Sequence, residues 1–453
     1  MSQTQAVVPQ RFAVWAVVAH PDGERVLCRD GQLPWLSLTG AVFHGEGIAQ
    51  ALSDLLQTEL TLLRRLAYRE SEVVWTLEAA KPVIQAEWLR PIQLPPAQRT
   101  WAQAALAPVP ATRPLWQRPG GWAMMLRWLD EQLEAQGRPR SGEPEILKHW
   151  QISSLLRIPT SDEPVYLKAV PGFFGAEVRV TCWLSRELAG AAPPVLAADS
   201  ARGLLLLGYA GEELPGERDE RSPQIAERQA SLEQSLALVR HLATLQRASE
   251  RRMAELCSEP LSLRRRDPAW LLTRLDDVLA VPLFLIGQAQ GLTRQQADGV
   301  LALRPTLEAA LRALASSLIP LTLSHGDLHS GNILCRSMNG QPDATIPQRF
   351  TLIDWSDASI SHPFLDINLD DLLPKAHQAA ALDVYLMAWI DLLPLSVLRD
   401  LAQQAQLAGE FFRILAYIDQ IQPGVEDADE WGEAHVGHYR GMLSWAARLA
   451  GVP

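Results

Sequence analysis

The spacing of hydrophobic residues divides the chain into a strand-rich first half and a helical second half. Short alternating or uninterrupted apolar runs predict strands, whereas apolar residues recurring every three or four positions predict amphipathic helices. Strands are expected at 12–19, 26–29, 73–77, 164–170, 193–199 and 203–209. Helices are expected at 47–63, 120–133, 177–189, 224–256, 268–281, 293–300, 306–317, 374–392, 395–420 and 431–449. This order predicts an α+β protein.

Two segments between these elements are candidates for connections. Residues 91–119 are rich in Pro, Ala and Trp, which favours an irregular segment. Residues 137–144 are polar and hold several turn formers. A chain of 453 residues can form two or three domains, and we place a boundary at this second segment.

The charge balance narrows the classes of partner. Acidic residues outnumber basic ones, 52 against 41, which gives a net charge of −11. A nucleic-acid or anionic-membrane partner is therefore not expected. No signal peptide and no apolar run of membrane-spanning length is recognisable. The four cysteines are scattered without metal-ligand spacing, which favours a reduced, cytoplasmic protein. The oligomeric state is left open.

The strongest chemical signal lies between residues 323 and 355. His325, Asp327, Leu328 and Asn332 match the H-x-D-L-x-x-x-N spacing of a kinase catalytic loop, and Asp354 ends a later apolar run. In that chemistry the first Asp accepts the proton of an attacking hydroxyl, while the Asn and the second Asp bind Mg²⁺ that bridges the ATP phosphates. The simpler alternative is a buried loop whose polar side chains only cap turns.

These residues resemble the aminoglycoside phosphotransferase family, which shares the protein-kinase-like fold. That family has Gly where protein kinases have Arg in the catalytic loop, and Gly326 stands at this position. The resemblance covers roughly residues 145–453. It implies a bilobal fold, with a small β-rich lobe at 145–210 and a large α-helical lobe at 211–453. It also implies ATP- and Mg²⁺-dependent transfer of a phosphate to a small-molecule hydroxyl on an amino sugar, sugar or amino alcohol.

Residues upstream of the loop are expected to hold ATP. Lys168, on the strand at 164–170, resembles the phosphate-binding lysine of a kinase, although a solvated strand lysine is the alternative. Glu177 is the expected carboxylate partner of this lysine, with Glu187 as second choice. The alternative for Glu177 is an acid in the first helical turn, where the helix dipole favours negative charge.

Two further segments complete the expected nucleotide site. No glycine-rich loop precedes the lysine, and backbone amides or the hydroxyls of Ser153 or Ser154 could cover the phosphates instead. An ordinary hairpin turn is the equal alternative for these serines. Gly208, Tyr209 and Ala210 follow the strand at 203–209 and resemble the hinge that offers backbone groups to adenine. A buried strand leading into a loop is the alternative there.

Three residues around the motifs have expected supporting roles. His329 is expected to hydrogen-bond the backbone of its own loop. Asp366 stands where the resembled family has an acid that supports the catalytic loop. Asp357 is either an acid behind the site or a surface-turn acid. No protein-kinase activation segment follows Asp354, which favours a small molecule over a protein as acceptor.

The N-terminal residues 1–95 are similar to a Nudix domain, joined by a linker with a helix at 96–144. Strands, a turn and a Gly-Glu-Gly sequence precede the expected helix in the order of that family. The Nudix helix carries clustered acids, but residues 51–59 keep only Asp54 and Glu59. Little is left to hold Mg²⁺, so this domain is expected to bind a ligand, cap the kinase part or mediate dimerisation. A divergent Nudix hydrolase is the alternative.

A second class of function stays open for the whole chain, namely a catalytically silent kinase-like protein that binds nucleotide or regulates. The presence of the base and both metal ligands argues against it. Acidic residues near the site and the C-terminus could attract a cationic substrate, although a solvated acidic surface is the simpler interpretation. They are Asp366, Asp370, Asp371, Glu426, Asp427, Asp429, Glu430 and Glu433.

Overall fold

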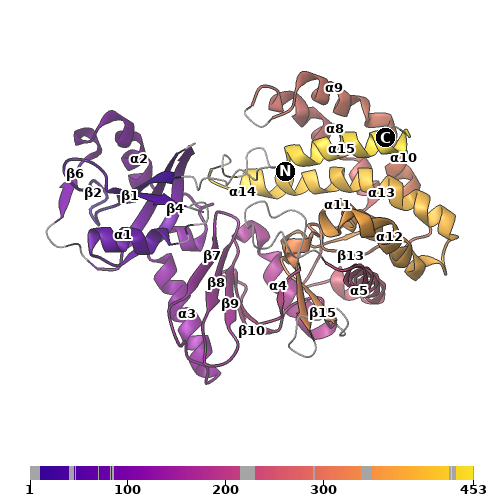
Figure 1. Ribbon diagram of the computed structural model, residues 1–453, viewed down its shortest axis with the longest axis horizontal. Helices are drawn as coiled ribbons and strands as arrows, with labels where there is room; N and C mark the ends of the chain where they lie inside the picture. The colour runs from indigo at the N-terminus through magenta and orange to yellow at the C-terminus, as the bar shows by residue number, and fades with distance from the viewer. Residues whose placement is uncertain are drawn as a thin grey trace, which may run out of the picture. The chain divides into compact units, whose positions relative to one another are not determined.

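The computed structural model describes residues 11–39, 45, 47–69, 71–81, 83, 86–214, 230–288, 291–337, 348–427, 430 and 435–451. The chain forms two compact units (Figure 1). The first comprises Met1–Gly172 with Ala201–Leu207, and the second comprises Phe173–Ser200 with Gly208–Pro453. Strands dominate the first unit and helices the second, which confirms the predicted α+β class.

The first unit begins with a mixed four-stranded sheet in the order β3-β1-β5-β4, in which β1 runs parallel to β5 and antiparallel to β3. Alternate side chains make two cores. One face packs on α1, through Ile48 and Leu52, and the other on α2, through Ala102. The elements are β1 (Arg11–Val18), β2 (Val26–Cys28), β3 (Trp35–Thr39), α1 (Ile48–Leu56), β4 (Leu60–Arg69), β5 (Glu72–Ala79), β6 (Glu87–Leu89), α2 (Pro96–Leu106) and α3 (Gly121–Ala135).

The expected helix at 47–63 is wrong in its second half. The helix α1 ends at Leu56, and Gln57 takes a left-handed conformation with φ 49°. Leu60–Arg69 then pairs with β5 as strand β4. Its apolar residues fit a helical and an extended spacing equally well, and pairing in the sheet decides between them.

The expected irregular segment at 91–119 is also wrong in part, because it contains α2. Proline at the first helical position and the following Ala, Gln and Arg residues favour a helix. Ala102 is fully buried against the sheet, so this helix belongs to the N-terminal core. The expected helix at 120–133 is confirmed as α3.

A second sheet in the first unit places β7, β8, β9 and β11 in the order β11-β9-β8-β7. The neighbours β7–β8 and β8–β9 are antiparallel. These strands confirm the expected extended segments at 164–170 and 203–209. Their bounds are β7 (Glu145–His149), β8 (Ser154–Ile158), β9 (Val165–Ala169) and β11 (Leu204–Gly208).

The second unit contains β10 (Val195–Asp199) and the helices that follow the predicted periodicity. Capping boxes begin two of them, at Ser231 for α5 and at Thr293 for α9. The helices are α4 (Ala176–Glu187), α5 (Leu232–Glu250), α6 (Met253–Leu256), α7 (Pro268–Leu272), α8 (Leu275–Ala280), α9 (Arg294–Ala302), α10 (Arg304–Ala315), α11 (Leu369–Leu372), α12 (Gln378–Leu386), α13 (Leu395–Ala416), α14 (Gln422–Gly424) and α15 (Val436–Leu449).

Three of the predicted helical ranges are subdivided. Residues 268–281 form α7 and α8, and residues 374–392 contain α12 between two short 3₁₀ turns. The helix α13 passes into a π-helical turn at Tyr417–Ile421. Parts of the expected ranges 224–256 and 431–449 lie outside the described residues, and α5, α6 and α15 confirm the remainder.

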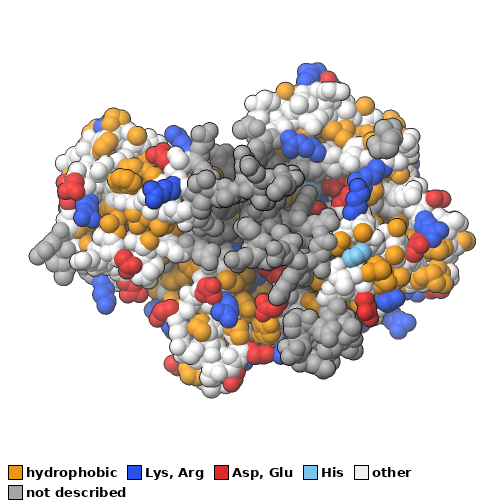
Figure 2. All heavy atoms as spheres, in the orientation of Figure 1, with side chains coloured by type: hydrophobic (Ala, Val, Ile, Leu, Met, Phe, Trp, Pro, Cys, Tyr) orange, Lys and Arg blue, Asp and Glu red, His pale blue; other side chains and the backbone are white. Residues whose placement is uncertain are grey.

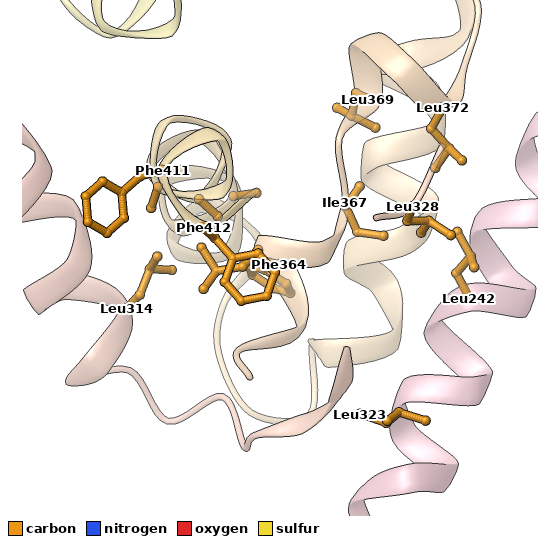
Figure 3. Packing of buried hydrophobic residues seen from close by; sticks show 14 of the residues in the cluster. Leu242, Leu314, Leu323, Leu328, Phe364, Ile367, Leu369, Leu372, Phe411 and Phe412 are labelled. Atoms are coloured by element: carbon orange, nitrogen blue, oxygen red, sulfur yellow. The ribbon is translucent and has the colours of Figure 1, made fainter. Parts of the chain in front are cut away.

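The core of the second unit reaches the predicted catalytic loop. Leu328 of that loop is 2% exposed and belongs to the same buried cluster as Leu242 of α5 and Phe412 of α13. Figure 3 shows Leu328 close to Leu242, with Ile367 beside it. The polar residues of the loop are therefore carried on a well-packed apolar support.

The surface of the molecule mixes charges of both signs. Figure 2 shows acidic and basic side chains interspersed among hydrophobic and neutral ones on the face in view. None of the helices within the described residues is long and apolar enough to cross a membrane.

Candidate active site

Two short antiparallel strand pairs in the second unit bring the two motifs together. The strands β13 (Thr322–Ser324) and β14 (Ile333–Ser337) flank the catalytic loop, and β15 (Gln348–Leu352) and β16 (Ser359–Ser361) flank the segment containing Asp354. The strand β13 pairs with β16, and β14 pairs with β15. The loop and the segment are therefore joined at both ends, through Ser324↔Ser359 and Ile333↔Leu352.

His325 connects the loop to that segment. Its Nε2 lies 2.7 Å from the carbonyl oxygen of Ile353, and its ring packs against Trp355 with centroids 4.6 Å apart. A carbonyl only accepts hydrogen bonds, so Nε2 carries the proton. The backbone N–H of Asp327 donates to the other ring nitrogen at 3.4 Å. His325 is therefore a buried connector between the two motifs.

Asp366 supports the catalytic loop, as predicted. Its carboxylate accepts hydrogen bonds from the hydroxyl of Ser324 and from the backbone N–H groups of His325 and Gly326, each at 2.9 Å. The side chain is buried. Such charge-assisted bonds fix the backbone immediately before Asp327.

Removing this support should destabilise the protein. We expect Asp366→Ala to lower the free energy of unfolding by about 3–5 kcal/mol, because three buried donors lose their partner. Urea denaturation measures the change. The matched control is Asp370→Ala, whose exposed pair with Arg448 at 3.2 Å should cost under about 1 kcal/mol. Equal losses in the two variants would contradict the supporting role.

Asp327 and Asn332 share the loop in a way that suits their predicted roles. The Asp327 side chain is 52% exposed, so a substrate can reach it. The side-chain amide nitrogen of Asn332 donates to the backbone oxygen of Asp327 at 2.9 Å. This bond uses the nitrogen within the loop and makes the amide oxygen the atom suited to a metal.

The imidazole of His329 accepts a hydrogen bond from the backbone of its own loop. Its Nδ1 accepts the N–H of Gly331 at 3.1 Å, which confirms the predicted hydrogen bond to the backbone. The Nε2 atom lies 3.7 Å from a carboxylate oxygen of Asp327. His329 thus borders the predicted base while capping the short 3₁₀ turn that carries Asn332.

Asp354 has an unusual backbone conformation, with φ 66° and ψ 63°. This left-handed region is rarely occupied by residues other than Gly, Asn and Asp, and strain of this kind concentrates at functional sites. The sequence contains no signal for it. The turn directly follows Ile353, whose N–H donates to the backbone oxygen of Asn332 at 3.0 Å.

Asp357 is a buried acid behind the site, so the alternative of a surface-turn acid is wrong. Gln420 donates to its carboxylate at 2.9 Å, and the buried Arg266 lies 3.9 Å away. Burial raises the pKa of Asp357 to about 7, Arg266 opposes this, and the charges of Asp327 and Asp354 add to it.

Gly326 has a physical reason to be glycine. Its φ is +88°, and a Cβ atom there would lie 2.5 Å from the backbone oxygen and 2.7 Å from the Cβ of Asp357. The arginine found in protein kinases has no room at this position. The close approach of the loop to Asp357 thus depends on this glycine.

A single methyl group at Gly326 should therefore be costly. We expect Gly326→Ala to lower the free energy of unfolding by about 2–4 kcal/mol, through backbone strain and overlap with Asp357. The control is Gly437→Ala in α15, where nothing lies within 4 Å of the added carbon. That control should be neutral or stabilising by up to about 1 kcal/mol. A Gly326 variant as stable as the control would contradict the described packing.

Sequence reasoning missed Tyr417, in the π-helical turn that ends α13. Its ring packs against His435 and His438, with centroids 5.8 and 6.0 Å apart. The pKa of Tyr417 is raised by burial and by the charges of Asp327 and Asp357. Turns of this kind are frequent at functional sites, but neither Tyr417 nor Gln420 belongs to a recognisable motif.

The residues present suit Mg²⁺. No group of three His, Cys, Asp or Glu side chains able to hold a metal occurs within the described parts of the chain. Magnesium is usually held by one or two carboxylates together with substrate phosphates and water. The carboxylate of Asp354 and the amide oxygen of Asn332 form a sparse set of this type.

The predicted nucleotide-binding residues lie on several elements. Lys168 is buried on β9 of the first unit, and pairing with Leu155 places it on the sheet face opposite to Ser154, which pairs with Ala169. In the same unit, the hydroxyl of Ser153 accepts a hydrogen bond from the indole of Trp150 at 2.6 Å. The hydroxyl of Ser154 therefore lies away from the sheet face that carries Lys168, and its backbone, not its side chain, is the part suited to that face.

The remaining predicted nucleotide residues belong to the second unit. Glu177 is buried in the first turn of α4, while Glu187 pairs with Arg252 at 2.8 Å. The backbone N–H of Gly208 donates to Pro194 at 2.8 Å. Tyr209 donates its hydroxyl hydrogen to Glu212 at 2.7 Å, and Ala210 is buried.

Residues 156–369 match the model of the phosphotransferase enzyme family. The match and the sheet-rich and helical parts confirm the protein-kinase-like fold. The family match does not reach the N-terminal domain, whose similarity to a Nudix domain stays a prediction. No curated protein sequence matches the chain.

Several solved structures are similar to this chain. Macrolide 2′-phosphotransferase MphH from Brachybacterium faecium is 16% identical over 72% of this chain and 97% of its own, with a TM-score of 0.44. A choline/ethanolamine kinase family protein from Mesorhizobium loti is 16% identical over 73% and 99%, with a TM-score of 0.46. Spectinomycin phosphotransferase, in complex with ADP and its antibiotic, is 10% identical over 70% and 93%, with a TM-score of 0.43.

Proposed function

We propose that the protein is an ATP- and Mg²⁺-dependent phosphotransferase that moves the γ-phosphate to a hydroxyl of a small molecule. The observation that carries this proposal is the joining of the two motifs. Paired strands and the His325–Ile353 contact join the loop that carries Asp327 and Asn332 to the segment that carries Asp354, and Asp366 fixes the start of that loop. A phosphotransferase works mainly by positioning and charge stabilisation, and such a support supplies the positioning.

Asp327 is the proposed base. Its exposed carboxylate orients the acceptor hydroxyl and accepts its proton. The hydroxyl oxygen then forms a bond to the γ-phosphorus, and the bond from that phosphorus to the bridging oxygen of ADP breaks. The products are ADP and a phosphate monoester. His325 contacts the backbone through its Nε2 and His329 through its Nδ1, and we assign the role of base to the exposed Asp327.

Asn332 and Asp354 are the proposed metal ligands. When bound, Mg²⁺ would neutralise charge that develops on the phosphate oxygens. The loop and the left-handed turn hold the two ligands without any ordering step at the moment of reaction. Asp357, which is buried beside Gln420 and Arg266, supports the segment that runs from Asp354 to β16.

The nucleotide contacts are proposed from the family resemblance. Lys168 would hold the phosphates and Glu177 would orient this lysine. The turn with Ser153 and Ser154 would cover the phosphates. The backbone at Gly208, Tyr209 and Ala210 would receive the adenine. Burial of Lys168 and Glu177 supports their roles, because charged side chains are seldom buried without a specific purpose.

The proposed acceptor is an amino sugar, sugar or amino alcohol. Two of the acids near the site are already engaged, since Asp366 supports the loop and Asp370 pairs with Arg448, so these two do not favour a cationic acceptor. Of the predicted C-terminal acids, Asp429 and Glu433 lie outside the described residues. We propose a cytoplasmic location and no nucleic-acid partner.

A screen tests the proposal. Amino sugars, sugars, nucleosides and amino alcohols are incubated with the protein, ATP and Mg²⁺, and ATP consumption is followed. We expect at least one acceptor to be phosphorylated. We also expect Mg²⁺ and ATP together to raise the melting temperature, since a ligand that binds the native state stabilises it. A protein unaffected by the nucleotide and inactive on every acceptor would favour the catalytically silent alternative.

A further inference from the structure

The turn between β7 and β8 is tied to the N-terminal region, defined here as residues 11–135. His149, the last residue of β7, is 1% exposed. Its Nε2 lies 2.9 Å from the backbone oxygen of Leu63 in β4. Its ring packs between Trp75 of β5 and Trp122 of α3, with centroid distances of 6.2 and 5.8 Å. These elements all belong to the first unit (Figure 1).

A β-bulge makes the Leu63 carbonyl available to this histidine. The pairing of β4 with β5 passes from Leu62↔Leu77 directly to Arg64↔Thr76, so Leu63 has no partner in the ladder. Bulges of this kind redirect the backbone and are frequent next to functional sites. The carbonyl only accepts, so His149 donates through Nε2. Burial lowers the pKa of His149 to about 4, which keeps the ring neutral near pH 7.

The next residue, Trp150, is held from two sides. Its backbone oxygen accepts a hydrogen bond from the indole of Trp116 at 2.8 Å, and Trp116 is fully buried. Its own indole donates to the hydroxyl of Ser153 at 2.6 Å. Its backbone N–H donates to the backbone oxygen of Ser153 at 3.1 Å. The turn Trp150–Ser153 is thus closed on itself and fixed from the N-terminal region.

The helix α3 is fixed to the same sheet. Both carboxylate oxygens of Glu78 accept the N–H of Gly120 at the start of α3, at 3.0 and 2.9 Å. A carboxylate is favourable at a helix N-terminus. The helix in turn carries Trp122, which packs on His149. The N-terminal sheet, α3 and the turn therefore form one connected set of contacts.

We propose that the N-terminal region acts as an anchor for the turn Trp150–Ser153, and that His149 and Trp116 are positioning residues for nucleotide binding. The inference rests on the proposed function, in which this turn covers the ATP phosphates. The turn contains no glycine, so its shape depends on these side-chain contacts rather than on glycine conformations. A turn whose shape is fixed before the nucleotide arrives loses less conformational entropy when it binds the nucleotide.

The test uses the full-length protein and measures the dissociation constant of Mg²⁺–ADP by titration calorimetry. We expect Trp116→Phe to weaken binding about fivefold, the size of effect associated with one lost hydrogen bond. We expect His149→Leu to weaken binding by a similar factor. His149→Gln keeps a donor at the end of the side chain and should stay within about twofold of the wild type.

Trp101→Phe is the matched control. Trp101 packs on Trp15, with centroids 5.8 Å apart, on the sheet face covered by α2. The same chemical change there should leave Mg²⁺–ADP binding unchanged. Thermal denaturation without nucleotide shows whether each variant is folded.

The outcomes separate failure of the anchor from failure of the proposed function. Folded Trp116→Phe and His149→Leu variants with wild-type affinity for Mg²⁺–ADP would overturn the anchor, as would an equal loss in Trp101→Phe. Should Trp116→Phe not fold, the His149→Leu and His149→Gln pair carries the test, and equal affinity in these two would overturn it. A wild-type protein that neither binds Mg²⁺–ADP nor consumes ATP contradicts the proposed function itself, and the anchor with it.

Discussion

Asp354→Asn is expected to lower kcat about a thousandfold or more. The substitution keeps the size of the side chain but removes the charge that would hold Mg²⁺. Metal stabilisation of the transition state is worth several kcal/mol, and about 4 kcal/mol corresponds to a thousandfold. Asparagine also tolerates the left-handed conformation seen at this position, φ 66° and ψ 63°. The fold should therefore survive while turnover is lost.

The measurement is kcat at saturating ATP over a range of Mg²⁺ concentrations. The variant should need more Mg²⁺ and should still not recover wild-type turnover. Asp383→Asn is the control, because Asp383 forms an exposed pair with Arg399 at 2.8 Å. That variant should keep wild-type kinetics. Undiminished kcat in a folded Asp354→Asn protein is incompatible with the proposed metal role.

Asp327→Asn is expected to lower kcat by about 10²–10⁴, the usual contribution of a general base. The amide can still hydrogen-bond the acceptor, but it cannot accept the proton. The bond from Asn332 to this residue uses the backbone oxygen, so the loop should keep its structure. The half-exposed side chain also contributes little to packing.

The two variants should differ in their dependence on ligands. Asp327→Asn should leave the KM for ATP and the Mg²⁺ requirement within a few-fold of wild type, whereas Asp354→Asn should change the Mg²⁺ requirement. Steady-state kinetics with ATP, Mg²⁺ and acceptor varied separately distinguishes them. Similar Mg²⁺ profiles for the two variants would argue that their roles are not separate.

The loop at residues 323–334 could be singled out from the sequence because its polar residues stand close together in the chain. His325, Asp327 and Asn332 stand within one short loop, and the spacing alone predicted a kinase-like site. Asp366 was predictable from the resemblance, and its three hydrogen bonds confirm the supporting role. The connecting role of His325 required the contact with Ile353, which no spacing indicates.

Other parts of the site depend on tertiary contacts and could not be predicted. Asp357 reads equally as a surface acid until Arg266 and Gln420, from distant parts of the chain, are seen beside it. Tyr417 depends on a π-helical turn that a periodic apolar pattern does not distinguish from the end of α13. The left-handed conformation of Asp354 is likewise a property of the folded chain.

The N-terminal region shows the same limit. Residues 60–69 have an apolar spacing compatible with a helix, but they pair with β5 and form the bulge that exposes the Leu63 carbonyl to His149. The feature that links this region to the turn Trp150–Ser153 is therefore one that the sequence pattern obscured. The strand register also bears on the role predicted for Ser154. It places the Ser154 side chain away from the sheet face of Lys168, and the sequence alone does not give this register.

Transfer of phosphate from ATP to a small-molecule hydroxyl can be followed by phosphorus NMR of the whole reaction mixture. The protein is incubated with ATP, Mg²⁺ and the best acceptor from the screen, beside a parallel Asp327→Asn sample. When the wild-type reaction has just reached completion, we expect equal amounts of ADP and a phosphate monoester with the wild type, and at most about one hundredth of these amounts with the variant. Inorganic phosphate without an ester would contradict transfer to a hydroxyl, and equal amounts of ester from both proteins at that time would contradict the role of Asp327.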